Sequence, residues 1–170
     1  ISYLETNKFN KIFDKEINEI NKSIINLEAK SSLNGISKNN PKKLTKKIKN
    51  YLLKNNSEIG IGLYGEKRNV YKGNNYISFF HSNERRNIHL GIDFFINEGT
   101  TIKSPIDGKV VILHNNKDKF DYGPTVVLEH NVNSEIKFYT LYGHLSEKCL
   151  KKLSIGKKIK KGDEFAEIGN

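Results

Sequence analysis

The feature that most limits the fold is the pattern after residue 58, where short apolar runs alternate with glycine-containing turns. The runs KVVIL, TVVLEH and IKFYTLY are rich in β-branched and aromatic residues, and the turns NEGT, PIDG and DYGP separate such runs. In this part of the chain a helical period appears only in SEKCLKKL. We therefore predict a mainly β domain with antiparallel sheet over residues 59–170.

Residues 1–58 have a different pattern, which indicates helices. From about Glu5 to Lys30, apolar residues step by four and three and give one stripe: Phe13, Ile17, Ile20, Ile24 and Leu27. After the loop SSLNGISKNNP, Pro41 suits the first turn of a second helix with an apolar side of Leu44, Ile48, Tyr51 and Leu52. We predict that residues 1–58 form a helical arm or linker of two amphipathic helices, which makes the chain α+β overall.

The charge of the chain says little about its partners. The formal net charge is +10, but every basic residue except Arg68, Arg85 and Arg86 is Lys, which in an Asn-rich chain suggests A/T-biased coding. We predict no nucleic-acid partner, and we note that all three Arg shortly precede His89. The Lys-rich segment PKKLTKKIKNYLLK is interpreted as a solvated helix face, with an anchor for an anionic surface as the alternative.

Two further features concern composition. No apolar run approaches the roughly 18 residues of a membrane span, so we predict no transmembrane segment. The single cysteine, Cys149, has no partner for an internal disulfide or for a cysteine-based metal cluster. We interpret it as a small apolar residue.

The segment RRNIHLGIDFFI contains the first candidate site. Apolar residues alternate with the others along it, which predicts a half-buried strand whose core-facing side is Ile88, Leu90, Ile92 and Phe94. The opposite side carries His89, Gly91 and Asp93 in succession. Packing in a core accounts for the apolar side. The presence of His89 and Asp93 together on the other side needs a separate explanation.

His89 and Asp93 carry ordinary zinc donors, but a flat strand would hold them roughly 13 Å apart. Both can bind one Zn²⁺, each at about 2.0–2.2 Å, only if the strand bends between them. Gly91 permits such a bend or bulge at the least cost. Because HxxxD is a common pattern, the spacing leaves two interpretations: a metal site, or a His and an Asp exposed on an edge strand.

The other histidines give weaker evidence for a functional site. His144, in FYTLYGHLS, follows a β run and lies beside Gly143; alone, it could be a hydrogen-bonded residue at a strand end. His130 shares a strand face with Leu128 and Val126, so we predict a structural role. His81 and His114 are predicted to be solvated in polar turns. The chain supports no nucleophilic triad and no phosphate-binding glycine loop.

Taken together, the motifs resemble a known family. The segments RRNIHLGIDFFINEGTTIKSPIDGKV, DYGPTVVLEH, FYTLYGHLS and IGKKIKKGDEFAEIG follow the order and spacing of the LytM/lysostaphin-like M23 zinc metallopeptidases. The resemblance covers roughly residues 59–169. It implies a barrel-sandwich-like β domain with one Zn²⁺ in a groove.

The resemblance also implies roles for three residues. His89 and Asp93 match two zinc ligands, and His144 matches a catalytic histidine that polarises the scissile carbonyl or stabilises the oxyanion. The activity implied is hydrolysis of peptide bonds by a water bound to the metal, typically in the cross-links or stems of peptidoglycan. The implied partner is therefore a peptide or peptidoglycan substrate.

The sequence departs from the family pattern at its end. The family has a later strand with His-x-His, which supplies the third zinc ligand and a second catalytic histidine. Here the sequence ends at Asn170, shortly after FAEIGN begins the approach to that strand, so we expect the third ligand beyond Asn170. With Ile1 at its start, we expect the chain to be an inactive piece of a longer protein with possible further domains on either side.

The phrases IGLYGEKRNVY and DYGPTVVLEH resemble a subgroup in which this domain is embedded in chains with kinase-like and aminotransferase domains. A typical family member would be in the cell envelope or secreted, and a member of that subgroup would be cytoplasmic. In either case we expect a bacterial origin.

Two alternatives stay open. One is a metal-free LytM-like binding or regulatory module; the missing His-x-His favours it, and the retained His89, Asp93 and His144 oppose it. The other is a biotinyl/lipoyl-like carrier or sugar-phosphotransferase module, because IKSPIDGKV and IGKKIKKGDEFAEIG follow the turn pattern of such barrels. Two features of the sequence oppose this second alternative. The carrier lysine motif is missing, and HLGID precedes SPIDG, which is not the order found in such modules.

Overall fold

The computed structural model describes residues 5, 8–28, 30, 31, 33, 40–68, 87–118 and 121–169. It divides the chain into two compact units, one of Ile1–Glu19 with Asn97–Asn170 and the other of Ile20–Ile96. These divisions differ from the predicted one after residue 58, because residues 22–24 pair with residues 59–61 in one sheet. The two predicted domains, 1–58 and 59–170, stay a prediction.

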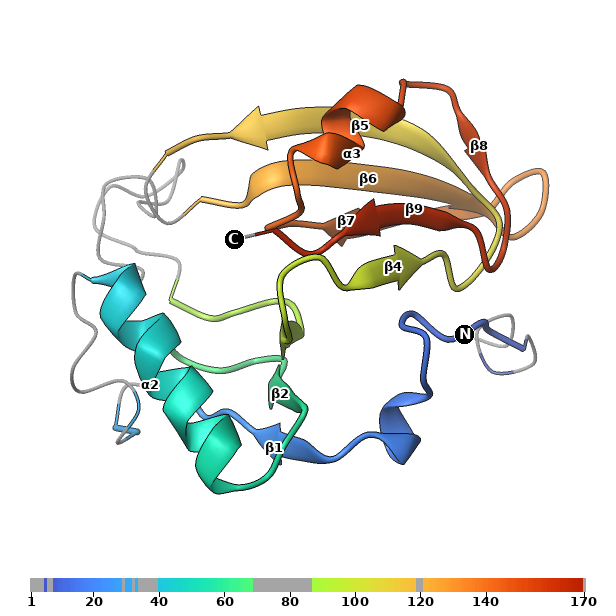
Figure 1. Cartoon of the computed structure of the whole chain (residues 1–170). Helices are drawn as coiled ribbons and strands as arrows, with labels where there is room; N and C mark the ends of the chain where they lie inside the picture. The colour runs from blue at the N-terminus through green and yellow to red at the C-terminus, as the bar shows by residue number, and fades with distance from the viewer. Residues whose placement is uncertain are drawn as a thin grey trace. The chain divides into compact units, whose positions relative to one another are not determined.

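The unit that contains residues 97–170 is built from antiparallel strand pairs (Figure 1). Its four-stranded sheet has the order β7 (Lys137–Tyr142), β6 (Gly123–Asn131), β5 (Gly108–Asn116), β8 (Lys158–Ile159). A two-stranded sheet pairs β4 (Thr101–Lys103) with β9 (Glu164–Glu167), and the short helix α3 covers Lys148–Lys152. The prediction of a mainly β fold is confirmed, and α3 lies in SEKCLKKL, the segment that carries the helical period in the sequence.

The interior of this unit includes β6, in which every residue from Thr125 to His130 is buried. Val110, Val126 and Leu128 are fully buried, as is the side chain of His130. The two ring nitrogens of His130 pair with Asp107 O at 2.8 Å and Thr140 Oγ1 at 2.7 Å. A buried imidazole with both nitrogens satisfied is a structural residue, so this prediction for His130 is confirmed.

The second unit has a three-stranded sheet with one long helix (Figure 1). Strand β2 (Ile59–Gly62) lies between β1 (Lys22–Ile24), which runs parallel to it, and β3 (Asp93–Phe95), which runs antiparallel. Helix α2 spans Pro41–Lys54, as the sequence predicts, and Asn40 caps it by accepting a hydrogen bond from the backbone N–H of Lys43. Its buried residues join the unit's apolar core: Ile25, Leu27, Leu33, Ile48 and Leu52.

The first predicted helix, from Glu5 to Lys30, is wrong over residues 8–28. The structure has a short 3₁₀ helix, η1 (Ile17–Glu19), followed by strand β1. The backbone N–H of Ile25 donates to Ile61 O at 2.9 Å, and Ile25 is buried whereas Ile24 is exposed. Several β-branched residues in this segment suit an extended backbone, and pairing with β2 satisfies its hydrogen bonds, so tertiary pairing overrides the helical spacing.

Helix α2 offers a matched test of this core. Replacing Leu52, which is 9% exposed, by alanine should lower the free energy of unfolding by about 2–5 kcal/mol, because a buried aliphatic group is lost and a cavity remains. Leu53→Ala on the same helix, where the side chain is 78% exposed, should change it by less than about 0.5 kcal/mol. Urea unfolding followed by circular dichroism measures both, and equal effects would contradict the packing of α2.

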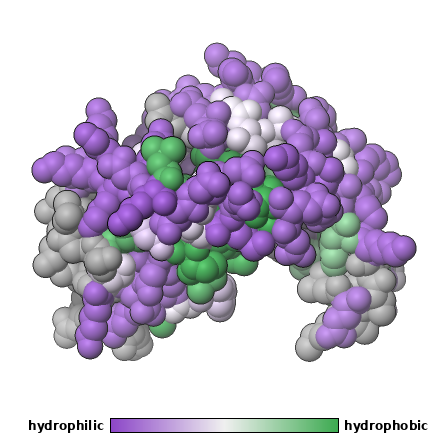
Figure 2. Space-filling view, turned by 60° about the horizontal axis from the view of Figure 1, so that its bottom comes forward, coloured by the Kyte–Doolittle hydropathy of each residue, from purple (hydrophilic) through white to green (hydrophobic). Residues whose placement is uncertain are grey.

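The face shown in Figure 2 is covered largely by hydrophilic side chains, with hydrophobic residues in smaller areas between them. Among the described residues, no helix has the length and apolar character that crossing a membrane requires.

Candidate metal site

His89 and Asp93 come together in the structure, as the sequence predicts for a metal site. The Nε2 atom of His89 lies 3.4 Å from Oδ1 of Asp93. The two residues do not lie on one flat strand, because β3 begins only at Asp93 and the backbone bends at Gly91. The prediction of one strand through HLGIDFFI is therefore wrong in extent, whereas the predicted bend between the two donors is present.

Gly91 allows a close approach of the His89 ring. A Cβ atom at position 91 would lie 3.2 Å from His89 Nε2 and 3.4 Å from His89 Cε1. Almost any side chain there would push the imidazole away from Asp93. The glycine therefore provides the bend and also the space in which the ring folds back toward the carboxylate.

The two sides of this segment are the reverse of what we predicted. Ile88, Leu90 and Ile92 are 52%, 73% and 58% exposed, whereas the side chains of His89 and Asp93 are 17% and 28% exposed. The reason is that residues 87–92 pair with a neighbouring segment only through the bridge from Ile88 to Lys67, and no sheet of the unit covers the apolar side there among the described residues. The polar side instead faces a buried ion pair.

A neighbouring segment, Gly65–Arg68, holds the backbone around His89. The N–H of Gly65 donates to His89 O at 2.8 Å, and the N–H of His89 donates to Glu66 O at 2.9 Å. The N–H of Arg68 donates to Asn87 O at 2.7 Å. These bonds position the histidine through its backbone, independently of its side chain.

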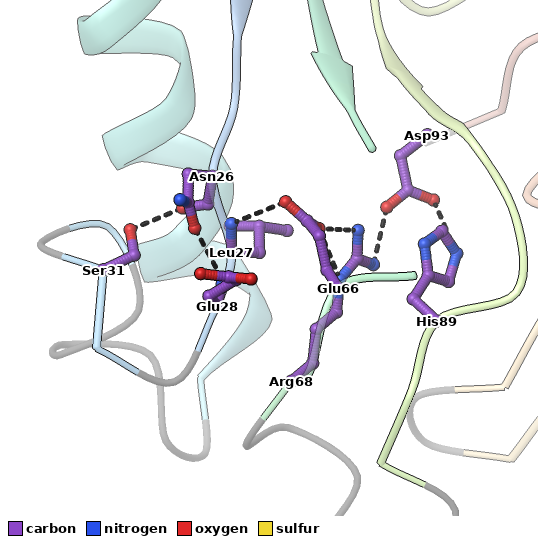
Figure 3. A network of polar contacts seen from close by, with 8 residues as sticks. All are labelled: Asn26, Leu27, Glu28, Ser31, Glu66, Arg68, His89 and Asp93. Atoms are coloured by element: carbon purple, nitrogen blue, oxygen red, sulfur yellow. Dashed lines mark hydrogen bonds and ion pairs between the residues drawn. The ribbon is translucent and has the colours of Figure 1, made fainter. Parts of the chain in front are cut away.

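One side chain of the same segment, that of Arg68, reaches Asp93 (Figure 3). Nη1 of Arg68 lies 2.6 Å from Oδ2 of Asp93, and Nε of Arg68 donates to Oε2 of Glu66 at 2.9 Å. The other oxygen of Glu66, Oε1, accepts from the backbone N–H of Leu27 at 3.2 Å. Sequence reasoning did not select Glu66 or Arg68, and its only signal was that the three Arg of the chain shortly precede His89.

The pair fits two ligands of a zinc ion. Two ligands of a tetrahedral Zn²⁺ at about 2.0–2.1 Å lie roughly 3.3 Å from each other, close to the separation of Nε2 and Oδ1. The second ring nitrogen of His89, Nδ1, is buried without a hydrogen-bond partner among the described residues. This nitrogen is not the one that faces Asp93, so an ion bound to Nε2 and Oδ1 would leave it without a partner.

A complete set of donors is not found in the described part of the chain. Within it, no group of three or more His, Cys, Asp or Glu side chains is placed to hold a metal. The described residues thus supply two donors, and a catalytic zinc takes three protein ligands. The third ligand that we expect beyond Asn170 stays a prediction.

His144 belongs to the other compact unit. It follows β7 with φ of +54°, a left-handed backbone that is uncommon for a residue other than glycine. Its N–H donates to Tyr122 O at 2.6 Å, its own carbonyl accepts from the N–H of Gly169 at 2.9 Å, and its side chain is exposed. Such backbone strain occurs often at functional sites, and the unit's hydrogen bonds hold it here.

The remaining predictions for single residues have mixed outcomes. His114 is exposed, as predicted, but it lies within β5 and not in a turn, because the strand continues to Asn116. His81 lies outside the described residues. Cys149 is buried, and burial raises the pKa of its thiol, which confirms its interpretation as a small interior residue.

The comparison with protein families supports a metallopeptidase-type domain. Residues 87–170 match the family model described as "Peptidase family M23". This part of the chain therefore belongs to the M23 peptidases, which confirms the family that the sequence motifs resemble.

One solved structure is also similar to this chain, described as "Crystal structure of a zinc containing peptidase from vibrio cholerae". The two are 30% identical, the match covers 51% of this chain and 24% of the other, and the TM-score is 0.39. The chain thus spans about a quarter of the length of that peptidase. A comparison with curated proteins gave no match.

Proposed function

We propose that the domain is a zinc-dependent metalloendopeptidase that hydrolyses peptide bonds, typically of peptidoglycan. The single observation that carries the proposal is the approach of His89 Nε2 and Asp93 Oδ1 to 3.4 Å at a backbone bend. The membership of residues 87–170 in the M23 peptidases supports the reaction class. Peptidoglycan as substrate rests on the family resemblance alone, and it would require a location in the cell envelope or outside the cell.

The residues of the chain divide into two roles under this proposal. His89 and Asp93 hold the metal, and His144 donates a hydrogen bond to the carbonyl oxygen of the scissile peptide as negative charge develops there. Zinc, when bound, supplies a Lewis acid that polarises the carbonyl and lowers the pKa of water. The donor set needs a third protein ligand for full affinity.

The test is a hydrolysis assay on the full-length gene product. Purified peptidoglycan and a synthetic stem peptide are incubated with the protein as isolated, after removal of metal by a chelator, and after addition of Zn²⁺. New amino termini are quantified in each case. We expect hydrolysis to disappear on chelation and to return with one equivalent of zinc.

Two results would contradict the proposal. Hydrolysis that persists after chelation would exclude a metal-dependent reaction. Binding of peptidoglycan in a sedimentation assay, with no zinc bound and no hydrolysis, would show that the domain is the metal-free binding or regulatory module of the alternative interpretation.

A further inference from the structure

The two carboxylate oxygens of Asp93 face different side chains (Figure 3). Oδ2 pairs with Nη1 of Arg68 at 2.6 Å, whereas Oδ1 faces Nε2 of His89 at 3.4 Å. A carboxylate held through one oxygen has a fixed rotation, and only the other oxygen is left to bind a metal. The ion pair with Arg68 therefore makes Asp93 a one-oxygen ligand with a defined direction.

The side chain of Arg68 is fixed in turn by contacts with Glu66. Arg68 and Glu66 are each only 6% exposed, and Nε and Nη2 of Arg68 both donate to Oε2 of Glu66. A guanidinium presents its donors in a rigid planar fork, so fixing one edge on Glu66 aims the other edge at Asp93. Glu66 is fixed in turn by the backbone N–H of Leu27.

Space for this pair is provided by Gly62 on β2. A Cβ atom at position 62 would lie 3.1 Å from Nη2 of Arg68 and 3.2 Å from Oδ2 of Asp93. Any side chain at this position would compete with the guanidinium for its place beside the carboxylate. The backbone of β2 thus accommodates the contact between Arg68 and Asp93.

The charges of Glu66, Arg68 and Asp93 suit a cation beside Asp93. Burying an ion pair costs desolvation that its attraction often fails to repay, so such a pair is weak evidence for stabilisation. Glu66, Arg68 and Asp93 together carry one net negative charge, which favours a cation at the free oxygen of Asp93. The same segment also fixes the backbone of His89 through its bonds to Gly65 and Glu66.

We infer that Arg68, held by Glu66, is a positioning residue that reserves Oδ1 of Asp93 for the metal. The inference rests on the proposed function, because it takes His89 and Asp93 as zinc ligands. Hydrogen-bond partners of metal ligands typically contribute 10–100-fold to metal affinity.

The test measures zinc affinity by competition with a chromophoric chelator, together with urea unfolding of the metal-free protein. Removing Arg68 alone would leave Glu66 buried and unpaired, so the main variant is the double substitution Glu66→Gln with Arg68→Met, which removes both buried charges. We expect its dissociation constant for zinc to rise about 10–100-fold while the metal-free protein keeps its fold. Arg68→Lys, which keeps the charge but loses the fork, should show an intermediate rise.

Lys67→Gln is the matched control. It removes one positive charge from the adjacent position, where the side chain is exposed, and it should leave zinc affinity unchanged. A double variant that binds zinc as tightly as the wild type, while His89→Ala does not bind it, would overturn the inference and leave the proposed function intact. A wild-type protein that binds no zinc would overturn both.

Discussion

Replacing His89 or Asp93 by alanine should remove zinc binding from the protein. Each change deletes one of the two donors that the structure brings to 3.4 Å from each other. Loss of a direct ligand should exceed the roughly 10–100-fold effect of an outer partner, so we expect binding to fall below detection in the chelator competition. Metal content by mass spectrometry after dialysis gives a second measurement.

The control for this experiment is His114→Ala. His114 is exposed on β5 and belongs to the other compact unit, so its removal should leave zinc content unchanged. Circular dichroism of each variant shows whether the fold is kept. Zinc content equal to the wild type in both His89→Ala and Asp93→Ala would refute the metal site.

Replacing His144 by glycine should leave zinc bound but lower kcat by about 10²–10³-fold. The magnitude is that of removing one donor to a developing oxyanion. Glycine is chosen because it has no side-chain donor and because the backbone at this position has φ of +54°, which glycine adopts without steric cost. The loss can then be assigned to the imidazole and not to a change in backbone conformation.

The measurement is the rate of peptide hydrolysis at saturating substrate, with zinc content determined on the same sample. A variant that loses zinc as well would show that His144 acts in metal binding and not in catalysis. A variant with wild-type activity would show that its exposed imidazole has no part in the reaction. His114→Ala serves again as the control for removal of an exposed histidine.

The strands of the domain could be predicted because their signal is local. In β6, the β-branched and apolar run TVVLEH indicates a strand, and every residue from Thr125 to His130 is buried. Helix α2 was predictable for the same reason, since Pro41 begins it and its apolar residues lie on one side. In the segment from Ile17 to Leu27 the local signal was misleading, because pairing with β2 replaced the helix that the spacing indicates.

The candidate site was only partly predictable. His89, Gly91 and Asp93 are close in sequence, so a bend between two donors could be inferred from spacing and bond lengths. Arg68 could not be assigned, because it reaches Asp93 across 25 positions of the sequence and nothing in the local pattern specifies that contact. Nor could the sequence show that the apolar residues Leu90 and Ile92 are the exposed side of the segment.

The sequence by itself determined the mainly β fold, the M23 family, the two donors and the glycine between them, because these depend on local spacing and residue chemistry. Only the tertiary structure decided which side of the segment is buried, which oxygen of Asp93 faces His89, and that Glu66 and Arg68 support it. Those features depend on contacts between β2, the segment after it and the segment before β3. Chain segments far apart in sequence set such contacts, and no local pattern encodes them.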